Sequence, residues 1–233
     1  MAAGGRTALS RRVDLSLVVD ADHYEILVQR VMRGARVSLW IATANVKEMR
    51  VEAPLGTAAR ARGRYVSVLD TFDELLSRGV EIRFLHAGTP SRAFRAELER
   101  HPRVQKRLVM RQCPRVHLKM IAVDGTELYL GSANFTGAGL GAKGDGRRNF
   151  ELGILTQDDV LLDVAQARFD RIWTGAECGG CRLRDVCPRP LDTPAPVPRP
   201  DGAVLTPRRP RKTLPEVTLA RPARAPPRAK KAR

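Results

Sequence analysis

The stretch from residue 116 to residue 130 contains the feature that most limits how this chain can fold. Two β-rich segments, 116–123 and 127–130, flank the dipeptide Asp124-Gly125. Asp-Gly between such segments is a strong signal for a two-residue hairpin turn, because both turn positions need a positive φ angle. The sequence therefore predicts two antiparallel neighbouring strands near the middle of the chain.

Strand and helix patterns alternate on both sides of this hairpin. Further strands are expected at 15–20, 36–42, 80–85, 107–111 and 151–156, and helices at 21–33, 66–78, 91–100 and 158–173. Such alternation, interrupted by a hairpin, predicts an α/β fold in which helices sandwich a mixed sheet. Two segments fit neither period and are expected to be irregular insertions: the arginine-bearing 46–65 and the glycine-rich 137–146.

The C-terminal stretch differs in composition from the rest of the chain. Residues 188–233 hold 12 of the 16 prolines, and 12 Lys or Arg against 3 Asp or Glu. Proline blocks helices, like charges repel, and the few apolar residues are too scattered to offset the entropy of ordering. We therefore expect a folded domain at 1–175, a cysteine-rich segment at 176–190 and a disordered basic tail at 191–233.

The chain is basic even without this tail. Residues 1–187 hold 29 Lys or Arg against 22 Asp or Glu, a net charge of +7, and the whole chain has a formal net charge of +16 and a pI near 10.9. Such a charge favours polyanionic partners, nucleic acid or an anionic membrane surface, through non-specific attraction. No apolar run approaches the roughly 20 residues of a membrane-spanning helix. Residues 1–12 lack the apolar segment of a secretory signal, so a cytoplasmic location is expected.

Polar residues with a regular spacing mark both strands of the hairpin. His117 and Lys119 are two positions apart, so their side chains point the same way in an extended strand. Ser132 and Asn134 repeat this spacing after the second strand. Folding at the hairpin turn brings the two pairs onto neighbouring strands, where a nucleophile, a cation and neutral donors can surround one phosphate.

The complete spacing, His-x-Lys, four residues, Asp, six residues and Gly-Ser-x-Asn, resembles the motif of the phospholipase D superfamily. The defined positions are His117, Lys119, Asp124, Gly131, Ser132 and Asn134. The order of strands and helices from about residue 15 to 173 is similar to the family's single-motif domain. The resemblance implies that 1–175 is a phospholipase D-like catalytic domain, a metal-independent phosphodiesterase that forms a phosphohistidine intermediate and needs no cofactor for catalysis.

The resemblance also implies a role for each motif residue. His117 would be the nucleophile. Lys119 and Asn134, helped by Ser132, would hold the phosphate oxygens and stabilise the charge that grows there. These residues would form both the catalytic centre and the phosphate-binding site.

Three further residues would support this centre. Glu151 fits the downstream carboxylate that accepts a hydrogen bond from the histidine in family members. The alternative is a strand-end glutamate paired with Arg147 or Arg148. Asp124 would shape the hairpin without touching substrate, and Gly131 would let the backbone approach closely.

The reaction needs a second histidine as acid and base. His23, His86 and His101 are the remaining histidines, and none has the motif around it. In single-motif relatives two chains place their copies across a two-fold axis. We therefore expect a homodimer with a shared active site, in which His117 of one chain is the nucleophile and His117 of the other is the acid and base.

The cysteines predict a metal-binding clip. Cys178, Cys181 and Cys187 form the spacing C-x2-C-x5-C within 176–190, and Cys113 lies four residues before His117. The decapeptide from Cys178 to Cys187 is similar to the last three cluster ligands of iron–sulfur DNA glycosylases of the helix-hairpin-helix type. The alternatives are a structural [4Fe-4S] cluster, a structural zinc ion or unmetallated thiols.

The substrate must be inferred from charge, because the hairpin chemistry is indifferent to what the phosphate joins. The basic body, the arginines of 46–65 and the basic tail favour a nuclease acting on DNA or RNA. A phospholipase D-type hydrolase working at an anionic membrane surface is the second hypothesis. A non-catalytic nucleic-acid-binding relative is the third, and the intact motif argues against it.

Overall fold

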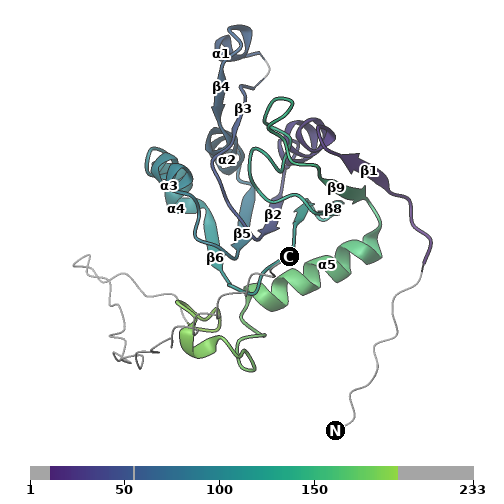
Figure 1. The fold of residues 1–233 in the computed structure, drawn as a ribbon, viewed down its shortest axis with the longest axis vertical. Helices are drawn as coiled ribbons and strands as arrows, with labels where there is room; N and C mark the ends of the chain where they lie inside the picture. Colours follow the sequence, from purple (N-terminus) through teal and green to yellow (C-terminus); the bar gives the residue numbers. More distant parts are fainter. Residues whose placement is uncertain (1–10, 55, 194–233) are drawn as a thin grey trace, which may run out of the picture. The chain divides into compact units, whose positions relative to one another are not determined.

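A mixed seven-stranded sheet forms the centre of the fold (Figure 1). The computed structural model describes residues 11–54 and 56–193, so nearly all of the expected tail lies outside the described residues. The strands of the sheet are β1 (Ser16–Val19), β2 (Ser38–Thr43), β5 (Glu81–His86), β6 (Val109–Gln112), β7 (Met120–Val123), β8 (Glu127–Gly131) and β9 (Leu152–Thr156). Their order is β1-β9-β8-β7-β2-β5-β6. Strand β5 is parallel to β2 and β6, and the other neighbours are antiparallel.

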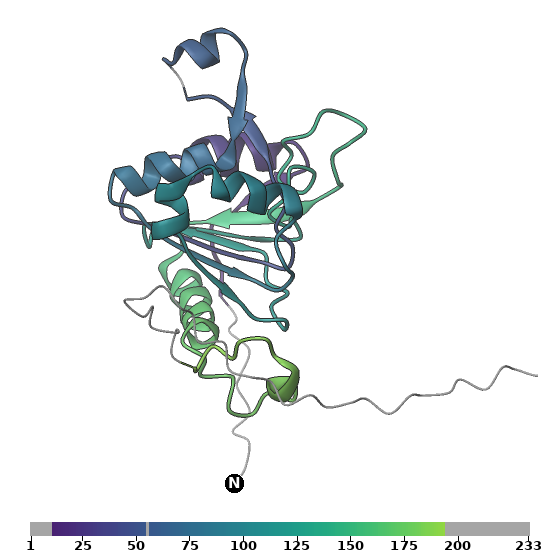
Figure 2. The same cartoon turned by 90° about the vertical axis from the view of Figure 1, so that its left-hand side faces the viewer.

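Helices cover both faces of this sheet (Figure 2). One face carries η1 (His23–Met32, a π-type helix), α2 (Val68–Ser77), α3 (Arg92–Glu99) and α4 (Pro102–Arg107), and the other carries α5 (Asp159–Trp173). Leu27, Phe72 and Phe84 belong to the first core, and Leu128 and Phe169 to the second. The α/β sandwich with a mixed sheet is thereby confirmed. Among the helices of 11–54 and 56–193, none has the length and apolar character to span a membrane.

The hairpin forms as expected, but its first strand is shorter. Strand β7 begins at Met120, whereas the sequence predicted a strand from residue 116. A turn precedes it, in which the N–H of Val116 donates to the carbonyl of Cys113 at 2.9 Å, and Pro114 has no N–H to offer a ladder. His117 and Lys119 therefore lie in an extended segment that leads into β7.

Helix α4 was missed because His101-Pro102 looks like a break. Pro102 stands in the first turn of the helix, where its missing N–H costs nothing.

The segment 46–65 was wrongly expected to be irregular. Strand β3 (Arg50–Glu52) pairs antiparallel with β4 (Tyr65–Ser67), and α1 (Ala58–Ala61) lies between them, so the segment forms a projecting arm (Figure 1). Strands of three residues are too short to show a period in sequence.

Asp124 fastens the hairpin turn to the start of β2. Asp124 and Gly125 have φ angles of 55° and 68°, as the predicted turn requires. The Asp124 carboxylate accepts hydrogen bonds from the N–H groups of Arg36, Val37 and Ser38, each at 2.8 Å. Burial alone would raise the pKa of Asp124, but these three donors outweigh it and hold the pKa below its ordinary value. The expected architectural role of Asp124 has a physical basis in these contacts.

Asp124→Ala should lower the free energy of unfolding by about 1.5–3 kcal/mol, because three N–H groups lose a charged acceptor. Asp124→Asn should cost less, since asparagine tolerates a positive φ and keeps one acceptor oxygen. Urea denaturation at neutral pH measures both losses. The matched control is Asp145→Ala, since the Asp145 side chain is 90% exposed, and its effect should stay within about 0.5 kcal/mol.

The gap between wild type and Asp124→Asn should also depend on pH. A lowered folded pKa means that the stabilisation is present above the ordinary aspartate pKa of about 3.9 and is lost as the pH falls through the folded value. Denaturation series at neutral pH and below pH ~3.9 would measure this. A gap that stays constant on acidification would contradict the assignment.

Candidate active site

His117 and Lys119 lie together at the entrance to β7. The His117 side chain is exposed, and the Lys119 ammonium nitrogen lies 3.0 Å from its Nδ1 and 3.2 Å from its Nε2. Lys119 Nζ also donates to the His117 carbonyl oxygen at 3.0 Å. Leu118 between them packs against the second core. The expected common orientation of the histidine and the lysine is confirmed by these contacts.

A carboxylate lies near this cation. Partial burial lowers the pKa of Lys119, while the negative charge of Glu151 acts in the opposite direction. Glu151 is the residue directly before β9, and its backbone is hydrogen-bonded to Asp20, the residue directly after β1. The Glu151 N–H donates to Asp20 Oδ1 at 2.8 Å, and the Asp20 N–H donates to the Glu151 carbonyl at 3.0 Å. Asp20 itself has φ 43°, a sparsely populated conformation held by these bonds.

The Glu151 side chain joins two other polar groups. Its carboxylate accepts hydrogen bonds from the Ser132 hydroxyl and, at 3.0 Å, from Asn149 Nδ2. Ser132 Oγ in turn accepts from the N–H of Leu152 at 3.1 Å. Arg148 pairs with Asp145, and within the described part of the chain neither Arg147 nor Arg148 forms an ion pair with Glu151. The described hydrogen bonds do not include one between Glu151 and His117, so that expected contact stays a prediction.

Asn134 is positioned by the end of β2. Its Oδ1 accepts from the Asn45 N–H at 3.2 Å, and the Thr43 hydroxyl lies 3.3 Å from this Oδ1 and 3.0 Å from the Asn45 carbonyl oxygen. The Phe135 N–H donates to Thr43 Oγ at 3.0 Å, and Val46 and Phe135 form a parallel bridge. With its Oδ1 turned toward the Asn45 N–H, Asn134 presents an amide nitrogen that has no hydrogen-bond partner within the described residues and can donate to an oxyanion.

A polar cleft of about 520 Å³ opens beside Asn134. Its lining includes Asn45, Lys47, Lys143 and Asn149. Both lysines are exposed at its rim. The glycine-rich segment 137–146, expected to be an irregular insertion, contributes Gly137, Ala138 and Lys143 to this lining. The sequence did not single out these cleft residues, because only their position after strand ends connects them.

A buried aromatic ring explains the motif glycine. The Tyr129 ring lies across Gly131 and Gly153, which face each other in the β8–β9 register. A Cβ on Gly131 would lie 2.2 Å from the Tyr129 hydroxyl, and a Cβ on Gly153 would lie 2.3 Å from Tyr129 Cε2. Tyr129 is 1% exposed, and its hydroxyl is hydrogen-bonded to His23 Nε2 at 2.8 Å. A close approach therefore does occur at Gly131, and the group that comes close is the Tyr129 side chain of the same sheet.

The other histidines have structural partners. His23 is fully buried, and burial lowers its pKa. His86 is buried, with Nδ1 bonded to the Gly88 carbonyl at 2.9 Å. His101 contacts the Glu97 carbonyl at 2.9 Å and Asp70 Oδ1 at 3.1 Å. Each ring is held by its own surroundings, and His117 is the one whose side chain is exposed.

A family profile described as "Cardiolipin synthase, PLD-like domain" matches residues 28–173. This match covers well over half of the chain and includes the motif from His117 to Asn134. The chain belongs to this phospholipase D-like family. No curated protein sequence matches the chain.

Several solved structures have a similar fold. Nuc from Salmonella typhimurium, a phospholipase D family member, is 16% identical with a TM-score of 0.50, over 70% of this chain and 95% of that chain. NucT from Helicobacter pylori is 16% identical with a TM-score of 0.47, over 69% of this chain and 95% of that one. Phosphatidylserine synthase from Haemophilus influenzae is 17% identical with a TM-score of 0.44, over 71% and 39%. At this identity the likeness to Nuc shows the fold alone.

Gly131→Ala should lower the free energy of unfolding by about 1–3 kcal/mol, because the new methyl group meets the Tyr129 ring. Combining it with Tyr129→Leu should cost less than the sum of the two single changes, since the smaller side chain removes the collision. Urea denaturation of the four proteins gives this coupling. Gly144→Ala is the control, because its Cβ would meet only Arg147 Nη2 at 3.8 Å. Strictly additive losses would contradict the packing argument.

Proposed function

We propose that this protein is a metal-independent phosphodiesterase that cleaves nucleic acid through a phosphohistidine intermediate on His117. The observation that supports this most directly is the contact of the Lys119 ammonium with the exposed His117 ring, 3.0 Å from Nδ1, inside a complete family motif. A histidine held next to a cation is suited to attack a phosphate whose oxygens that cation neutralises.

The reaction would proceed in two displacements. A ring nitrogen of His117 attacks phosphorus, the bond to the leaving oxygen breaks, and a second histidine gives that oxygen a proton. Water then attacks phosphorus, the second histidine takes the water proton, and the phosphorus–nitrogen bond breaks to release the product. Lys119 and Asn134 would bind the non-bridging oxygens in both steps.

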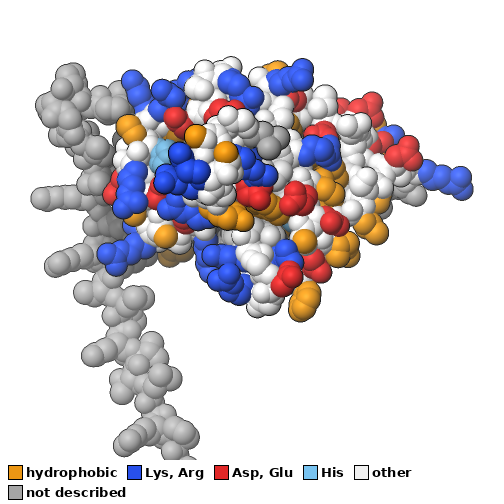
Figure 3. Space-filling model, turned by 90° about the horizontal axis from the view of Figure 1, so that it is seen from above, with side chains coloured by type: hydrophobic (Ala, Val, Ile, Leu, Met, Phe, Trp, Pro, Cys, Tyr) orange, Lys and Arg blue, Asp and Glu red, His pale blue; other side chains and the backbone are white. Residues whose placement is uncertain are grey.

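The surroundings of the site favour a nucleic-acid substrate. Lys47 and Lys143 line the polar cleft beside Asn134 and can contact further phosphates along a strand. The arm adds Arg62 and Arg64, both exposed, next to Tyr65, which is 60% exposed. Seen from above, where the arm projects, the molecule carries many Lys and Arg side chains (Figure 3). An exposed aromatic ring among arginines is suited to stack on a base.

An apolar surface beside the site favours a second copy of the chain as the source of the second histidine. Leu17, Phe150 and Leu152 are 61%, 96% and 57% exposed, and Val19 is 42% exposed. Val19 faces Leu152 in the β1–β9 register, and Glu151 lies between Phe150 and Leu152. If the same edge of a second chain covered this apolar edge, the two copies of the motif would lie close to a two-fold axis.

Phosphodiester cleavage should persist in EDTA, because histidines and a lysine carry the chemistry of the family motif. His117→Ala and Lys119→Ala should each lower the rate by at least about a thousandfold with the fold intact. Purified protein is offered labelled single-stranded DNA, duplex DNA, RNA and cardiolipin vesicles in parallel, with EDTA present. His101→Asn is the control histidine variant, since its ring is held by Asp70 and Glu97.

Three outcomes separate the hypotheses. Cleavage of a nucleic acid supports the proposal. Hydrolysis of cardiolipin alone would replace the nuclease by a phospholipase. Strict dependence on added magnesium would contradict the histidine mechanism.

A heterodimer of wild type and His117→Ala should be almost inactive, because one phosphate needs the histidines of both chains. Differently tagged chains can be co-expressed and the mixed dimer isolated by two affinity steps. A heterodimer of wild type with His101→Asn should keep full activity. Half the wild-type activity in the His117→Ala heterodimer would show that each chain works alone.

The apolar edge gives a second test of the shared site. Leu17→Lys should weaken self-association and lower the activity per chain at low protein concentration, with recovery at high concentration. Val109→Lys is the control, since Val109 is 50% exposed on β6 at the opposite edge of the sheet. Analytical ultracentrifugation and activity assays over the same concentration range check this. Full activity of a Leu17→Lys monomer would contradict the shared site.

A further inference from the structure

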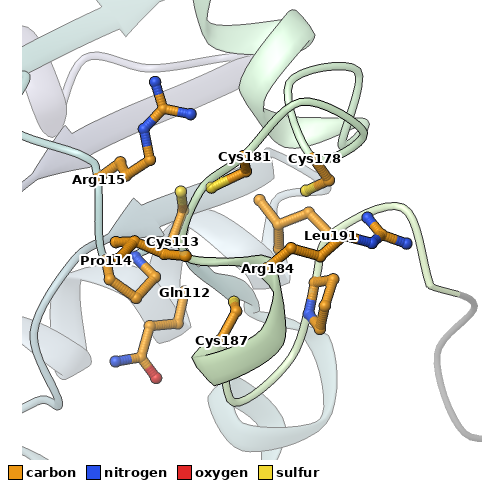
Figure 4. Close-up of a pocket in the computed structure, with 11 residues that line it drawn as sticks. Gln112, Cys113, Pro114, Arg115, Cys178, Cys181, Arg184, Cys187 and Leu191 are labelled. Atoms are coloured by element: carbon orange, nitrogen blue, oxygen red, sulfur yellow. The ribbon is translucent and has the colours of Figure 1, made fainter.

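We propose that Cys113, Cys178, Cys181 and Cys187 bind one structural metal centre through their thiolates. All four cysteines are partly buried, and all four line one pocket (Figure 4). Cys113 comes from the turn after β6, whereas the other three come from the segment that follows α5. Four sulfurs from two distant parts of the chain around one cavity form a donor set suited to zinc or to an iron–sulfur cluster. The proposal is independent of the proposed phosphodiesterase activity.

The segment 174–193 buries little apolar surface of its own. It contains one three-residue 3₁₀ helix, η2 (Arg184–Val186), which has no buried residue. Leu183 and Val186 are 39% and 70% exposed, and Leu191 is the buried apolar side chain of the segment. A stretch with so little apolar burial cannot offset its ordering entropy by packing. Short segments of this kind are typically stabilised by a metal or a disulfide.

Turns within the segment bring its cysteines close together. The Cys181 N–H donates to the Cys178 carbonyl at 3.2 Å, and the Cys187 N–H donates to the Arg184 carbonyl at 3.3 Å. Gly175 has φ 81°, and a Cβ there would lie 2.2 Å from the Asp192 nitrogen. The two ends of the segment therefore meet, and the cysteines lie on the loop between them.

Two arginines line the pocket that holds the four sulfurs. Four thiolates around one divalent ion carry two excess negative charges, which need compensation in a partly buried site. Arg115 and Arg184 line the same pocket, and Arg184 also pairs with Asp192 at 2.5 Å. Their guanidinium groups can offset part of this negative charge and donate to the sulfur atoms, as groups around sites of this type do.

The arrangement of the pocket bears on the kind of metal. Its cavity is about 20 Å³, close to the room that one water-sized sphere needs. Within 11–54 and 56–193, no three Cys, His, Asp or Glu side chains already converge as a finished metal site. Binding would therefore draw the thiols inward around one ion, with release of their protons to solvent, or move 178–187 outward around a cluster. The shared chemistry is a four-thiolate centre, and the experiment distinguishes the two metals.

The centre would also support the catalytic segment. The carbonyl oxygen of Cys113 accepts a hydrogen bond from the Val116 N–H at 2.9 Å, in the turn that ends one residue before His117. The Cys113 N–H donates to the His86 carbonyl at 2.8 Å. Arg111 on β6 donates to the carbonyls of Trp173 and, at 2.6 Å, Leu191. A metal at Cys113 would thus cross-link α5, the cysteine segment and the start of the catalytic hairpin.

The full chain purified without oxygen is tested for zinc, iron and acid-labile sulfide, and its thiols are titrated before and after chelation. One equivalent of zinc in a colourless protein, or iron with equal sulfide and broad visible absorbance, supports the centre and identifies it. In either case the four thiols should become reactive only after the metal is removed. Four thiols that react at once, in protein that takes up neither zinc nor a reconstituted cluster, would overturn the proposal.

Single variants test the ligand set. Cys113→Ser and Cys178→Ser should each reduce the bound metal from one centre per chain to nearly none. Val186→Ser, an exposed residue of the same segment, should leave it unchanged. Metal content is read together with the circular dichroism spectrum, so that loss of the fold is recognised. A Cys113→Ser protein that keeps its fold and its full metal content would remove Cys113 from the site and overturn the four-cysteine arrangement.

Discussion

The carboxylate of Asp124 sets the position from which the rest of the site is built. Its hydrogen bonds to Arg36, Val37 and Ser38 fix the hairpin turn against the first residues of β2. With this end fixed, β7 can pair with β2 in one register, Val123 opposite Leu39 and Met120 opposite Ala42. A shift by one residue would turn every side chain of β7 to the opposite face. The orientation of the segment that carries His117 and Lys119 follows from that register.

The motif was predictable because its residues lie close together in the sequence, and the chemistry assigned to it came from the resemblance to the phospholipase D superfamily. His117, Lys119 and the Asp124-Gly125 turn needed only the strand period and turn chemistry. The cleft was not predictable, because Asn45, Lys47 and Lys143 come from loops whose meeting depends on the whole sheet. The Val46–Phe135 bridge that brings those loops to Asn134 is a single long-range pair, which leaves no period in the sequence.

The partners of Glu151 illustrate a second limit of sequence reasoning. Resemblance suggested His117 as its partner, whereas the structure gives its carboxylate the Ser132 hydroxyl and Asn149. A carboxylate can accept several hydrogen bonds, and Ser132 and Asn149 are the donors that bond to it here. Its charge still acts on Lys119, because a charge needs proximity and no defined bond direction. An electrostatic role for Glu151 is thus compatible with both sets of partners.

The layout of polar and apolar surfaces limits how a substrate could reach a shared site. Glu151 stands next to Leu152 of the apolar edge, and the polar cleft is lined by Asn134 and Asn149. If a second copy covers the apolar edge, the cleft with Lys47 and Lys143 remains open to solvent. A strand lying in the cleft would then contact Lys47 and Lys143 beside the motif residue Asn134. Because a two-fold axis supplies two such clefts, an extended phosphate backbone could contact both chains, which a single lipid headgroup is too short to do.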